Sequence, residues 1–263
     1  MSALTSQFSI LWPALLAGLL VVLSHVPLGQ QVLSRGIVFI DLAIAQVAGL
    51  GVIAAHSAGF ELAGWTTQIA AVCSALLAAL LLTWTERKRP EAQEALIGVL
   101  FVLASTAQIL LLANDPHGGE DLKDLLAGQI LWVSTQQLVR AAILTAIFLV
   151  VWFRWRERFG RIGFYVLFAF MVTASVQLVG VYLVFTSLIV PALATYRYPQ
   201  RRQLAIGYVF AFSSYVLGLW SSAVVDLPSS AVIVWVMALL GLLVHVMNRN
   251  GVSTLNAGNH RTR

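Results

Sequence analysis

The chain alternates between long runs of uncharged, mostly apolar residues and short clusters of charged residues. A helix that spans a lipid bilayer needs about 20 consecutive, predominantly apolar residues. Most of the uncharged runs approach or exceed this length, and together they cover most of the sequence: residues 1–34, 42–60, 62–85, 95–114, 141–153, 162–196, 203–225 and 227–248. The pattern predicts an all-α protein, a polytopic bundle of transmembrane helices.

The run at 162–196 is too long for a single crossing. A helix of its length would measure about 52 Å, whereas the hydrocarbon core of a bilayer is about 30 Å thick. Gln177 and Gly180 lie near the middle of the run and Pro191 near its end, and such residues favour a break. We therefore expect a helix to about residue 177, a turn, and a shorter helix that folds back.

The basic residues support this split, because loops on the cytoplasmic side of a membrane are enriched in Lys and Arg. If 162–196 forms two segments, every basic cluster falls on one side of the membrane: Arg35, Arg87 to Arg89, Arg154 to Arg161, Arg197 to Arg202, and Arg249 to Arg263. The expected topology has about nine hydrophobic segments, with the N-terminus outside and the C-terminus inside. Residues 1–250 would form the transmembrane domain and 251–263 a short polar cytoplasmic tail.

Composition agrees with a membrane protein. Hydrophobic residues make up 59% of the chain and charged residues only 10%, with a mean hydropathy of +0.86, too few charges to cover a soluble domain. The net charge of +5 would suit nucleic acid, but the basic residues lie in the expected loops, so no nucleic-acid partner is predicted. The single cysteine, Cys73, excludes an intrachain disulfide.

Polar residues inside a predicted span are candidates for function, because they are costly in lipid. Asp41 lies at the start of the second segment, and Gln46 follows further along. One interpretation places Asp41 as a cation-binding or gating group on a translocation pathway, with Gln46 nearby. The other makes Asp41 an interfacial carboxylate that Arg35 neutralises.

Three further polar residues leave alternatives open. Glu94 begins the fourth segment, where a carboxylate favours a helix N-terminus, although a role in transport is the competing interpretation. Gln177, at the expected fold-back, could satisfy freed backbone groups or line the pathway. His25, near the end of the first segment, is either an interfacial hydrogen-bonding residue or a ligand.

The segment from 114 to 134 is expected to form an outer loop with a short amphipathic stretch. It gathers several potential metal-ligand types: Asp115, His117, Glu120, Asp121 and Asp124. The spacing matches no fixed metal motif, so a solvated acidic rim that docks a partner or concentrates cations is favoured over a metal site.

No enzyme motif is present, since the sequence lacks GxSxG, HExxH, GxGxxG and the phosphate-binding GxxxxGK[ST] loop. The chain therefore cannot hydrolyse ATP by itself, and active transport would need a separate subunit or an ion gradient. A gradient-driven carrier and a membrane-embedded enzyme are the rival classes. The first would predict an inverted repeat and more intramembrane carboxylates, and the second a nucleophile with a base.

Several motifs resemble those of the metal ABC permeases, the ABC-3 type family of zinc, manganese and iron importers. RGIVFIDLAIAQVAGLGV at 35–52 is similar to the segment around that family's DALSHA motif, and QEALIGVLFV at 93–102 and LLAGQILWVS at 125–134 resemble two further elements. The most specific match is VQLVGVYLVFTSLIVPALATY at 176–196. DLPSSAVIV at 226–234 follows the closing pattern except for Ser230 in place of glycine.

The resemblance implies a permease of the cell (inner) membrane that forms a homodimer and works with a cytoplasmic ATPase dimer that binds ATP. It also implies an extracytoplasmic metal-binding protein, for which the acidic loop would be the docking site. No cofactor is expected to be bound permanently, and the transported divalent metal is the cargo. The run from Pro191 would lead into the ATPase-coupling segment, with Ala192, Ala194, Tyr196 and Arg197 in the contact; an ordinary juxtamembrane turn is the alternative.

One departure from the family pattern affects the expected metal pathway. DALSHA places Asp and His four residues apart, one helical turn, but the residue four after Asp41 is Ala45, and Gln46 comes one later. Alignment on Gly51 instead puts Gln46 at the histidine position and Leu42 at the aspartate position. The metal pair is thus not intact, and the expected order of cargoes, zinc first with manganese and iron next, rests on the resemblance alone.

Overall fold

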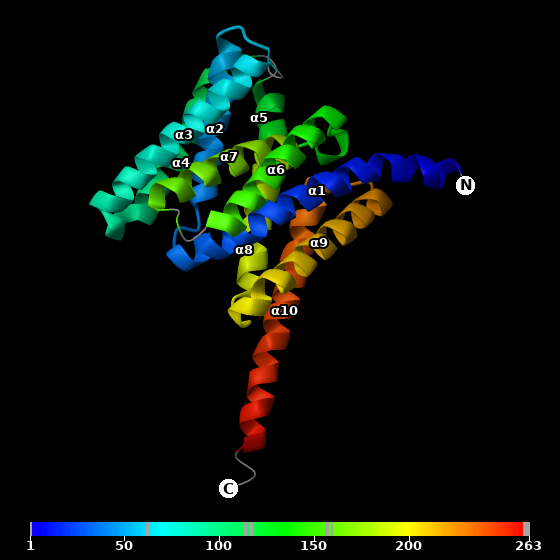
Figure 1. Ribbon diagram of the computed structural model, residues 1–263. Coiled ribbons are helices and arrows are strands. Elements are labelled where there is room, and N and C mark those ends of the chain that lie inside the picture. Colours follow the sequence, from blue (N-terminus) through cyan, green and yellow to red (C-terminus); the bar gives the residue numbers. More distant parts are fainter. Residues whose placement is uncertain are drawn as a thin grey trace.

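The structure is a computed structural model that describes residues 2–61, 64–112, 115, 118–155, 158 and 160–259. Within these residues the chain is helical and contains no strand, which confirms the predicted all-α class (Figure 1). The α-helices are α1 (Ser2–Arg35), α2 (Ile40–Ser57), α3 (Trp65–Lys88), α4 (Gln93–Leu112), α5 (Gly118–Ala127), α6 (Thr135–Trp155), α7 (Arg161–Val179), α8 (Val181–Thr195), α9 (Gln200–Val225) and α10 (Ser229–Asn259). Two 3₁₀ turns, η1 (Pro90–Ala92) and η2 (Ile130–Trp132), lie between them.

Seven of these helices are long and apolar enough to cross a membrane, by length and composition: the helices α1, α2, α3, α4, α6, α7 and α9. Two shorter apolar helices, Val181–Thr195 and Ser229–Val244, join them in the described part of the chain. The protein is therefore a multi-pass membrane protein. Nine crossings and the orientation of the termini stay predictions, and α10 continues past residue 250 to Asn259 without a break at the expected domain boundary.

The predicted break within 162–196 is present. Helix α7 ends at Val179, Gly180 has φ 82°, and α8 starts at Val181. A side chain is strained at such a φ. Gly128, with φ 67°, lies directly against Gly180, and a Cβ atom on either glycine would overlap the backbone of the other segment. The break therefore lets the connection between α5 and α6 pass close to the start of α8.

The helices form two groups, and α7 packs against members of both: α2 and α3 of one, and α8, which packs with α9 and α10, of the other. Figure 1 shows α2, α3 and α4 together on one side and α9 and α10 on the other, with α1 running across the bundle. In the most apolar stretch of each helix, 61% is buried in α2 and in α7, but only 22% is buried in α4 and in α6. Helices α2 and α7 thus occupy the interior, and α4 and α6 present most of their surface outward.

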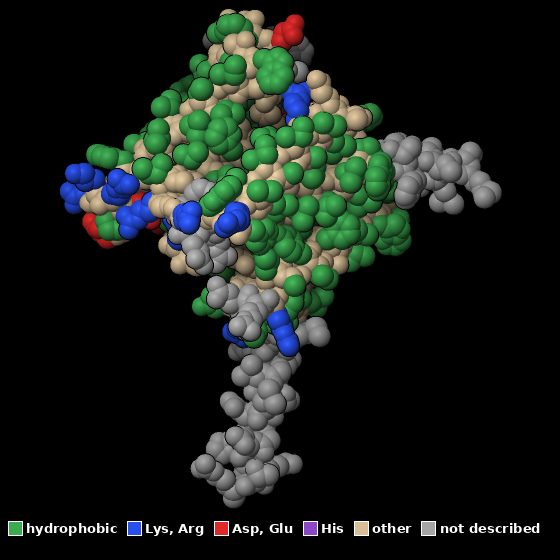
Figure 2. All heavy atoms as spheres, in the orientation of Figure 1, with side chains coloured by type: hydrophobic (Ala, Val, Ile, Leu, Met, Phe, Trp, Pro, Cys, Tyr) green, Lys and Arg blue, Asp and Glu red, His purple; other side chains and the backbone are tan. Residues whose placement is uncertain are grey.

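The surface has the character that a bilayer requires. In Figure 2, hydrophobic side chains cover most of the visible face, and several Lys and Arg side chains form a band that starts at its left edge. Exposed apolar residues include Leu77, Leu110 and Val150. Cys73, on α3, is also exposed and is a free thiol.

Several basic clusters meet at one end of the bundle, which we call the basic end. Arg161 Nε lies 3.8 Å from Glu86 Oε1, so the start of α7 adjoins the end of α3. The Arg35 guanidinium lies 4.1 Å from the centroid of the Phe164 ring, so the end of α1 is also here. This arrangement agrees with the prediction that these clusters face one side of the membrane.

Candidate translocation site

Asp41 is a buried carboxylate without a partner. It lies in the first turn of α2 with 1% of its surface exposed. Both of its carboxylate oxygens are buried and make no hydrogen bond with any described residue. Arg35 contacts Phe164 and forms no ion pair with Asp41. The structure therefore does not support the interpretation in which Arg35 neutralises this carboxylate.

A carboxylate in this setting is energetically unfavourable. Burial of an ionised group without a partner costs several kcal/mol, so such groups are protonated, paired or bound to a cation. Inside a membrane they commonly mark pathways for ions or protons. Asp41 is thus a group whose environment would improve if a cation came next to it.

Gln46 lies further along α2 and is held by a residue that the sequence did not single out. Its backbone carbonyl oxygen and its Oε1 both accept hydrogen bonds from Gln108 Nε2 of α4, at 2.7 and 2.8 Å. Both side chains are buried, and Gln108 Oε1 has no described partner. A long amide side chain near the middle of the uncharged run at 95–114 was the signal that could have identified Gln108.

Helix α5 reaches down to this pair. A Cβ atom on Gly49 would lie 3.1 Å from both Leu125 methyl groups and 3.4 Å from Gln108 Nε2. The predicted outer loop is therefore in part a helix that enters the bundle, and the Gln46–Gln108 pair lies beneath it. Asp41 and Gln46 do not share one face of α2, because a separation of five residues turns the helix by about 140°.

Glu94 stabilises the start of α2. Its Oε1 accepts a hydrogen bond from the backbone N–H of Phe39, the residue before α2, at 3.4 Å, and its Oε2 is buried without a described partner. The expected capping role of Glu94 thus has a geometric basis, although the capped helix is α2 and not its own helix α4. Through this contact Glu94 fixes the turn that precedes Asp41.

Gln177 and His25 lie apart from these contacts. Gln177 is in the last turn of α7, close to the fold-back as expected, but its side chain is exposed and makes no hydrogen bond to the freed backbone groups. His25 is fully buried within α1, where Nδ1 lies 2.9 Å from Ser24 Oγ and 3.1 Å from the Val21 carbonyl oxygen. Its burial makes His25 a core residue and not an interfacial one, and its Nε2 has no described partner.

The acidic segment does not form a metal site in the part that the structure describes. Glu120 and Asp124 are exposed on α5, and Gln129 Nε2 donates a hydrogen bond to Asp124 Oδ2 at 2.6 Å. Asp115 is partly buried; His117 and the Asp121 side chain lie outside the described residues. No group of three or more His, Cys, Asp or Glu residues among those described could hold a metal ion.

The expected coupling segment divides into a buried and an exposed part. Pro191 lies inside α8, and Ala192 and Ala194 are buried against the bundle. Tyr196 is 68% exposed and Arg197 is exposed beside it. The small side chains of Ala192 and Ala194 face inward, where they fit between packed helices, so a contact through these two residues stays a prediction. Of the predicted coupling residues, Tyr196 and Arg197 are the ones exposed at the turn between α8 and α9.

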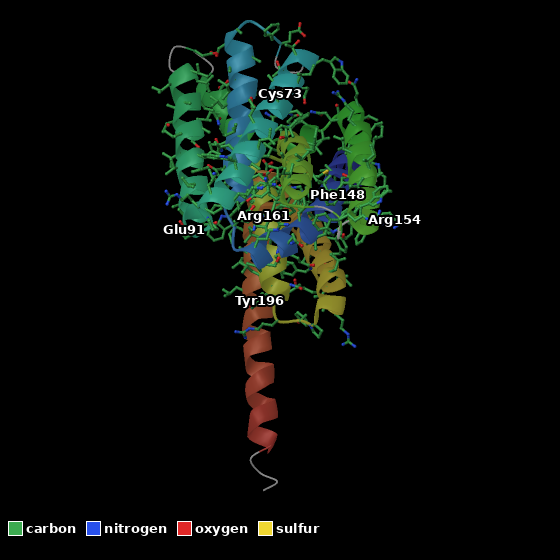
Figure 3. All side chains as sticks on the ribbon, turned by 60° about the vertical axis from the view of Figure 1, so that its left-hand side comes forward. Cys73, Glu91, Phe148, Arg154, Arg161 and Tyr196 are labelled. Carbon is green, nitrogen blue, oxygen red and sulfur yellow. The ribbon has the colours of Figure 1, made fainter. Side chains whose placement is uncertain are left out.

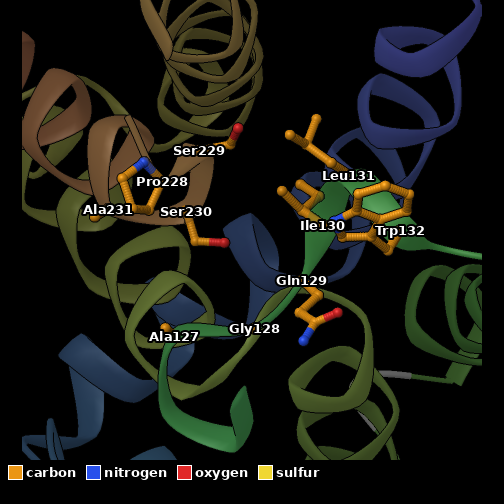
Figure 4. Close-up of a pocket in the computed structure, with 10 residues that line it drawn as sticks. All are labelled: Ala127, Gly128, Gln129, Ile130, Leu131, Trp132, Pro228, Ser229, Ser230 and Ala231. Atoms are coloured by element: carbon orange, nitrogen blue, oxygen red, sulfur yellow. The ribbon is translucent and has the colours of Figure 1, made fainter. Parts of the chain in front are cut away.

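A cavity of about 170 Å³ lies where the connection after α5 meets the start of α10 (Figure 4). Its walls include Gln129, Trp132 and Ser230, and the Ser230 side chain points into it. Its described lining residues include none of the site residues predicted from the sequence.

Comparison with known proteins decides the family. The sequence model of the ABC 3 transport family matches residues 7–164 and 156–248. The chain belongs to the ABC 3 transport family. Membership in the ABC 3 family makes it a permease subunit of a metal ABC importer and not itself an enzyme.

Two relatives and one solved structure illustrate the likeness of this ABC 3 protein to others. The manganese transport system membrane protein MntC of Halalkalibacterium halodurans is 26% identical over 94% of this chain and 91% of its own length. An uncharacterised membrane protein of Synechocystis sp., slr2045, is 26% identical over 90% of each chain. The structure of PsaBC from Streptococcus pneumoniae in complex with Fab has a TM-score of 0.72 at 22% identity, covering 93% of this chain and 95% of that one, which supports the fold.

Proposed function

We propose that this chain is the pathway-forming permease of an importer for divalent metal ions, with Asp41 as the group that meets the ion inside the membrane. The observation that carries the proposal is the burial of Asp41 with both oxygens unpartnered. A passing cation would supply the missing partner, and a permease should hold its ion weakly enough to release it. Gln46, which Gln108 fixes on a different face of α2, would add an amide at a second point of the pathway, and Glu94 positions the start of α2.

The proposed cargo is manganese, with zinc second and iron after it. Zinc was the first expectation from the family resemblance. Asp41 and Glu94 carry carboxylate oxygens and Gln46 carries an amide oxygen, and such ligands suit manganese better than zinc, which favours nitrogen and sulfur. The relative named for manganese transport supports manganese as the first candidate.

The proposed assembly follows the family. Two copies of the permease would form a homodimer in the inner membrane and receive the ion from a metal-binding protein. That protein would dock at the acidic segment, where Glu120 and Asp124 are exposed on α5. A cytoplasmic ATPase dimer would bind the turn that presents Tyr196 and Arg197. Residues 251–263 would form a cytoplasmic tail, and Gln177, exposed on α7, would lie on the pathway between the two copies.

Metal content of cells tests the proposal. Cells that lack this chain are complemented with the wild type, Asp41→Asn or Asp41→Ala, and manganese, zinc and iron are measured by elemental analysis. We expect the wild type to restore manganese and both variants to fail while remaining in the membrane in normal amount. Normal uptake by Asp41→Asn would remove the carboxylate from the mechanism. If the wild type restores the zinc content but not the manganese content, the proposed manganese cargo is wrong.

A gradient-driven carrier is the competing class. Membrane vesicles that contain the purified chain but no ATPase distinguish the two. Metal uptake by such vesicles would contradict an ATP-driven permease, whereas uptake that needs a copurifying ATPase and ATP supports it.

A further inference from the structure

Six exposed basic residues form a surface at the basic end of the bundle, which we call the basic belt: Arg87, Lys88, Arg89, Arg154, Arg158 and Arg161. They come from the ends of α3 and α6, the connection after α6, and the start of α7. The ion pair between Arg161 and Glu86 joins the parts on α3 and α7. Glu86 is only 17% exposed, so its charge faces inward, and the surface remains strongly positive despite the exposed Glu91.

The surroundings of the basic belt are those of residues at the membrane–water interface. Figure 3 shows Glu91, Arg154 and Arg161 at nearly one level, with Cys73 above them toward the middle of α3 and Tyr196 beyond them. Two tryptophans flank the belt, Trp84 at 58% and Trp155 at 40% exposure. Tryptophan side chains exposed at the ends of spanning helices concentrate at the membrane–water interface, so the neighbouring basic groups extend into the headgroup layer.

We propose that the basic belt binds the phosphate groups of anionic phospholipids. Guanidinium groups present paired N–H donors that match phosphate oxygens, and basic clusters beside spanning helices attract anionic lipids. Exposed apolar residues next to the belt, such as Phe153 at 60% exposure, offer the lipid chains a surface to lie on. Lipid is favoured over the ATPase as occupant because the turn with Tyr196 projects beyond the belt. The inference does not depend on which metal is transported.

Native mass spectrometry of the full chain in detergent tests this proposal. Phosphatidylglycerol or phosphatidylcholine is titrated in, and the binding constant of each lipid is read from the population of lipid-bound protein. We expect preferential binding of phosphatidylglycerol. Each basic residue near a surface strengthens attraction to anionic lipid about fivefold, so the triple variant Arg87→Gln/Lys88→Gln/Arg89→Gln should lose at least about tenfold of that preference.

Matched variants separate a site from a general effect of net charge. Arg154→Gln/Arg158→Gln, a second change within the belt, should also weaken phosphatidylglycerol binding. Arg197→Gln/Arg202→Gln removes two charges from the turn between α8 and α9 and from the first turn of α9, and it should leave phosphatidylglycerol binding unchanged. The charge-preserving Arg87→Lys/Arg89→Lys should also leave it unchanged. Equal binding of the two lipids by the wild type would overturn the proposal. An equal loss of phosphatidylglycerol preference in the Arg197→Gln/Arg202→Gln control would also overturn it. The same holds if the belt variants keep their lipid preference but no longer associate with the ATPase.

Discussion

Gln108 holds Gln46 through a single amide nitrogen, which donates to both the backbone carbonyl oxygen and the side-chain oxygen of its partner. The two residues lie 62 positions apart in sequence and join α2 to α4 in the buried interior. Because Gln108 Oε1 has no described partner, the contact leaves one polar atom unsatisfied where a polar atom is costly. The pair thus fixes the orientation of Gln46 at some energetic cost.

Replacement of Gln108 by leucine should lower both stability and metal uptake. The substitution leaves the Gln46 carbonyl oxygens without their donor, and hydrogen bonds between membrane helices contribute about 0.5–2 kcal/mol. Thermal unfolding of the purified protein in detergent and uptake in complemented cells measure the two effects. Thr106→Val is a suitable control, because Thr106 is exposed on the same helix and bonds only to carbonyls of its own helix. Unfolding of Gln108→Leu at the control temperature would contradict a stabilising role.

Alanine at Gly180 should destabilise the protein more strongly. A non-glycine residue at this backbone conformation costs about 1–3 kcal/mol, and the added Cβ would also overlap the Gly128 backbone. The loss should be measured as a lower unfolding temperature in detergent.

Gly98→Ala provides the control for this substitution. Gly98 lies within α4, and a Cβ atom there would meet nothing within 4 Å. Since alanine favours a helix interior over glycine by up to about 1 kcal/mol, Gly98→Ala should unfold at the wild-type temperature or higher. Equal unfolding temperatures for the two alanine variants would contradict this prediction, because they would show that the backbone at Gly128 and Gly180 shifts at little cost to admit a Cβ atom.

The role of Glu94 can be divided by two substitutions. A glutamine side chain at this position would keep an oxygen that accepts the Phe39 N–H, so Glu94→Gln should retain stability. Glu94→Leu removes the acceptor and should lose about 1 kcal/mol. Unfolding temperatures test this expectation, and equal losses in the two variants would argue against a capping role. Loss of metal uptake by Glu94→Gln at normal stability would instead assign the charge to transport.

Reversal of charge at Arg197 should uncouple ATP hydrolysis from transport. Arg197 is exposed beside Tyr196 on the turn proposed to contact the ATPase, and a carboxylate there would alter the charge complementarity of that contact. ATPase activity and metal uptake by the reconstituted importer measure coupling. Lys88→Glu places the same change in the basic belt and should remain coupled; normal coupling by Arg197→Glu would exclude Arg197 from the contact.

The sequence predicted those features that depend on local pattern. Uncharged length predicted the spanning helices, and the excess length of 162–196 predicted a break that the structure places at Gly180, three residues after the expected Gln177. The meeting of Arg35, Glu86 and Arg161 at one end agrees with the distribution of basic residues along the chain.

Features that depend on contacts between distant segments were missed. Gln108 has no local signal beyond its polarity, and its bond to Gln46 depends on how α2 and α4 cross. The inward orientation of Ala192 and Ala194 follows from the helices around α8, since alanine fits both a packed interior and an exposed surface. The absence of an ion pair between Asp41 and Arg35 likewise reflects the position of Phe164, a residue 129 positions beyond Arg35 that receives the guanidinium.

Cys73 makes this chain a convenient subject for spectroscopy. It is the only cysteine of the protein, and its thiol is exposed on α3, away from the ends of that helix. A nitroxide or fluorophore can therefore be attached at one defined depth without the removal of other thiols. The accessibility of a nitroxide label to oxygen, which concentrates in the bilayer, can be compared with its accessibility to a water-soluble relaxing agent. The ratio would measure how deeply this position of α3 lies in the membrane, with no other residue changed.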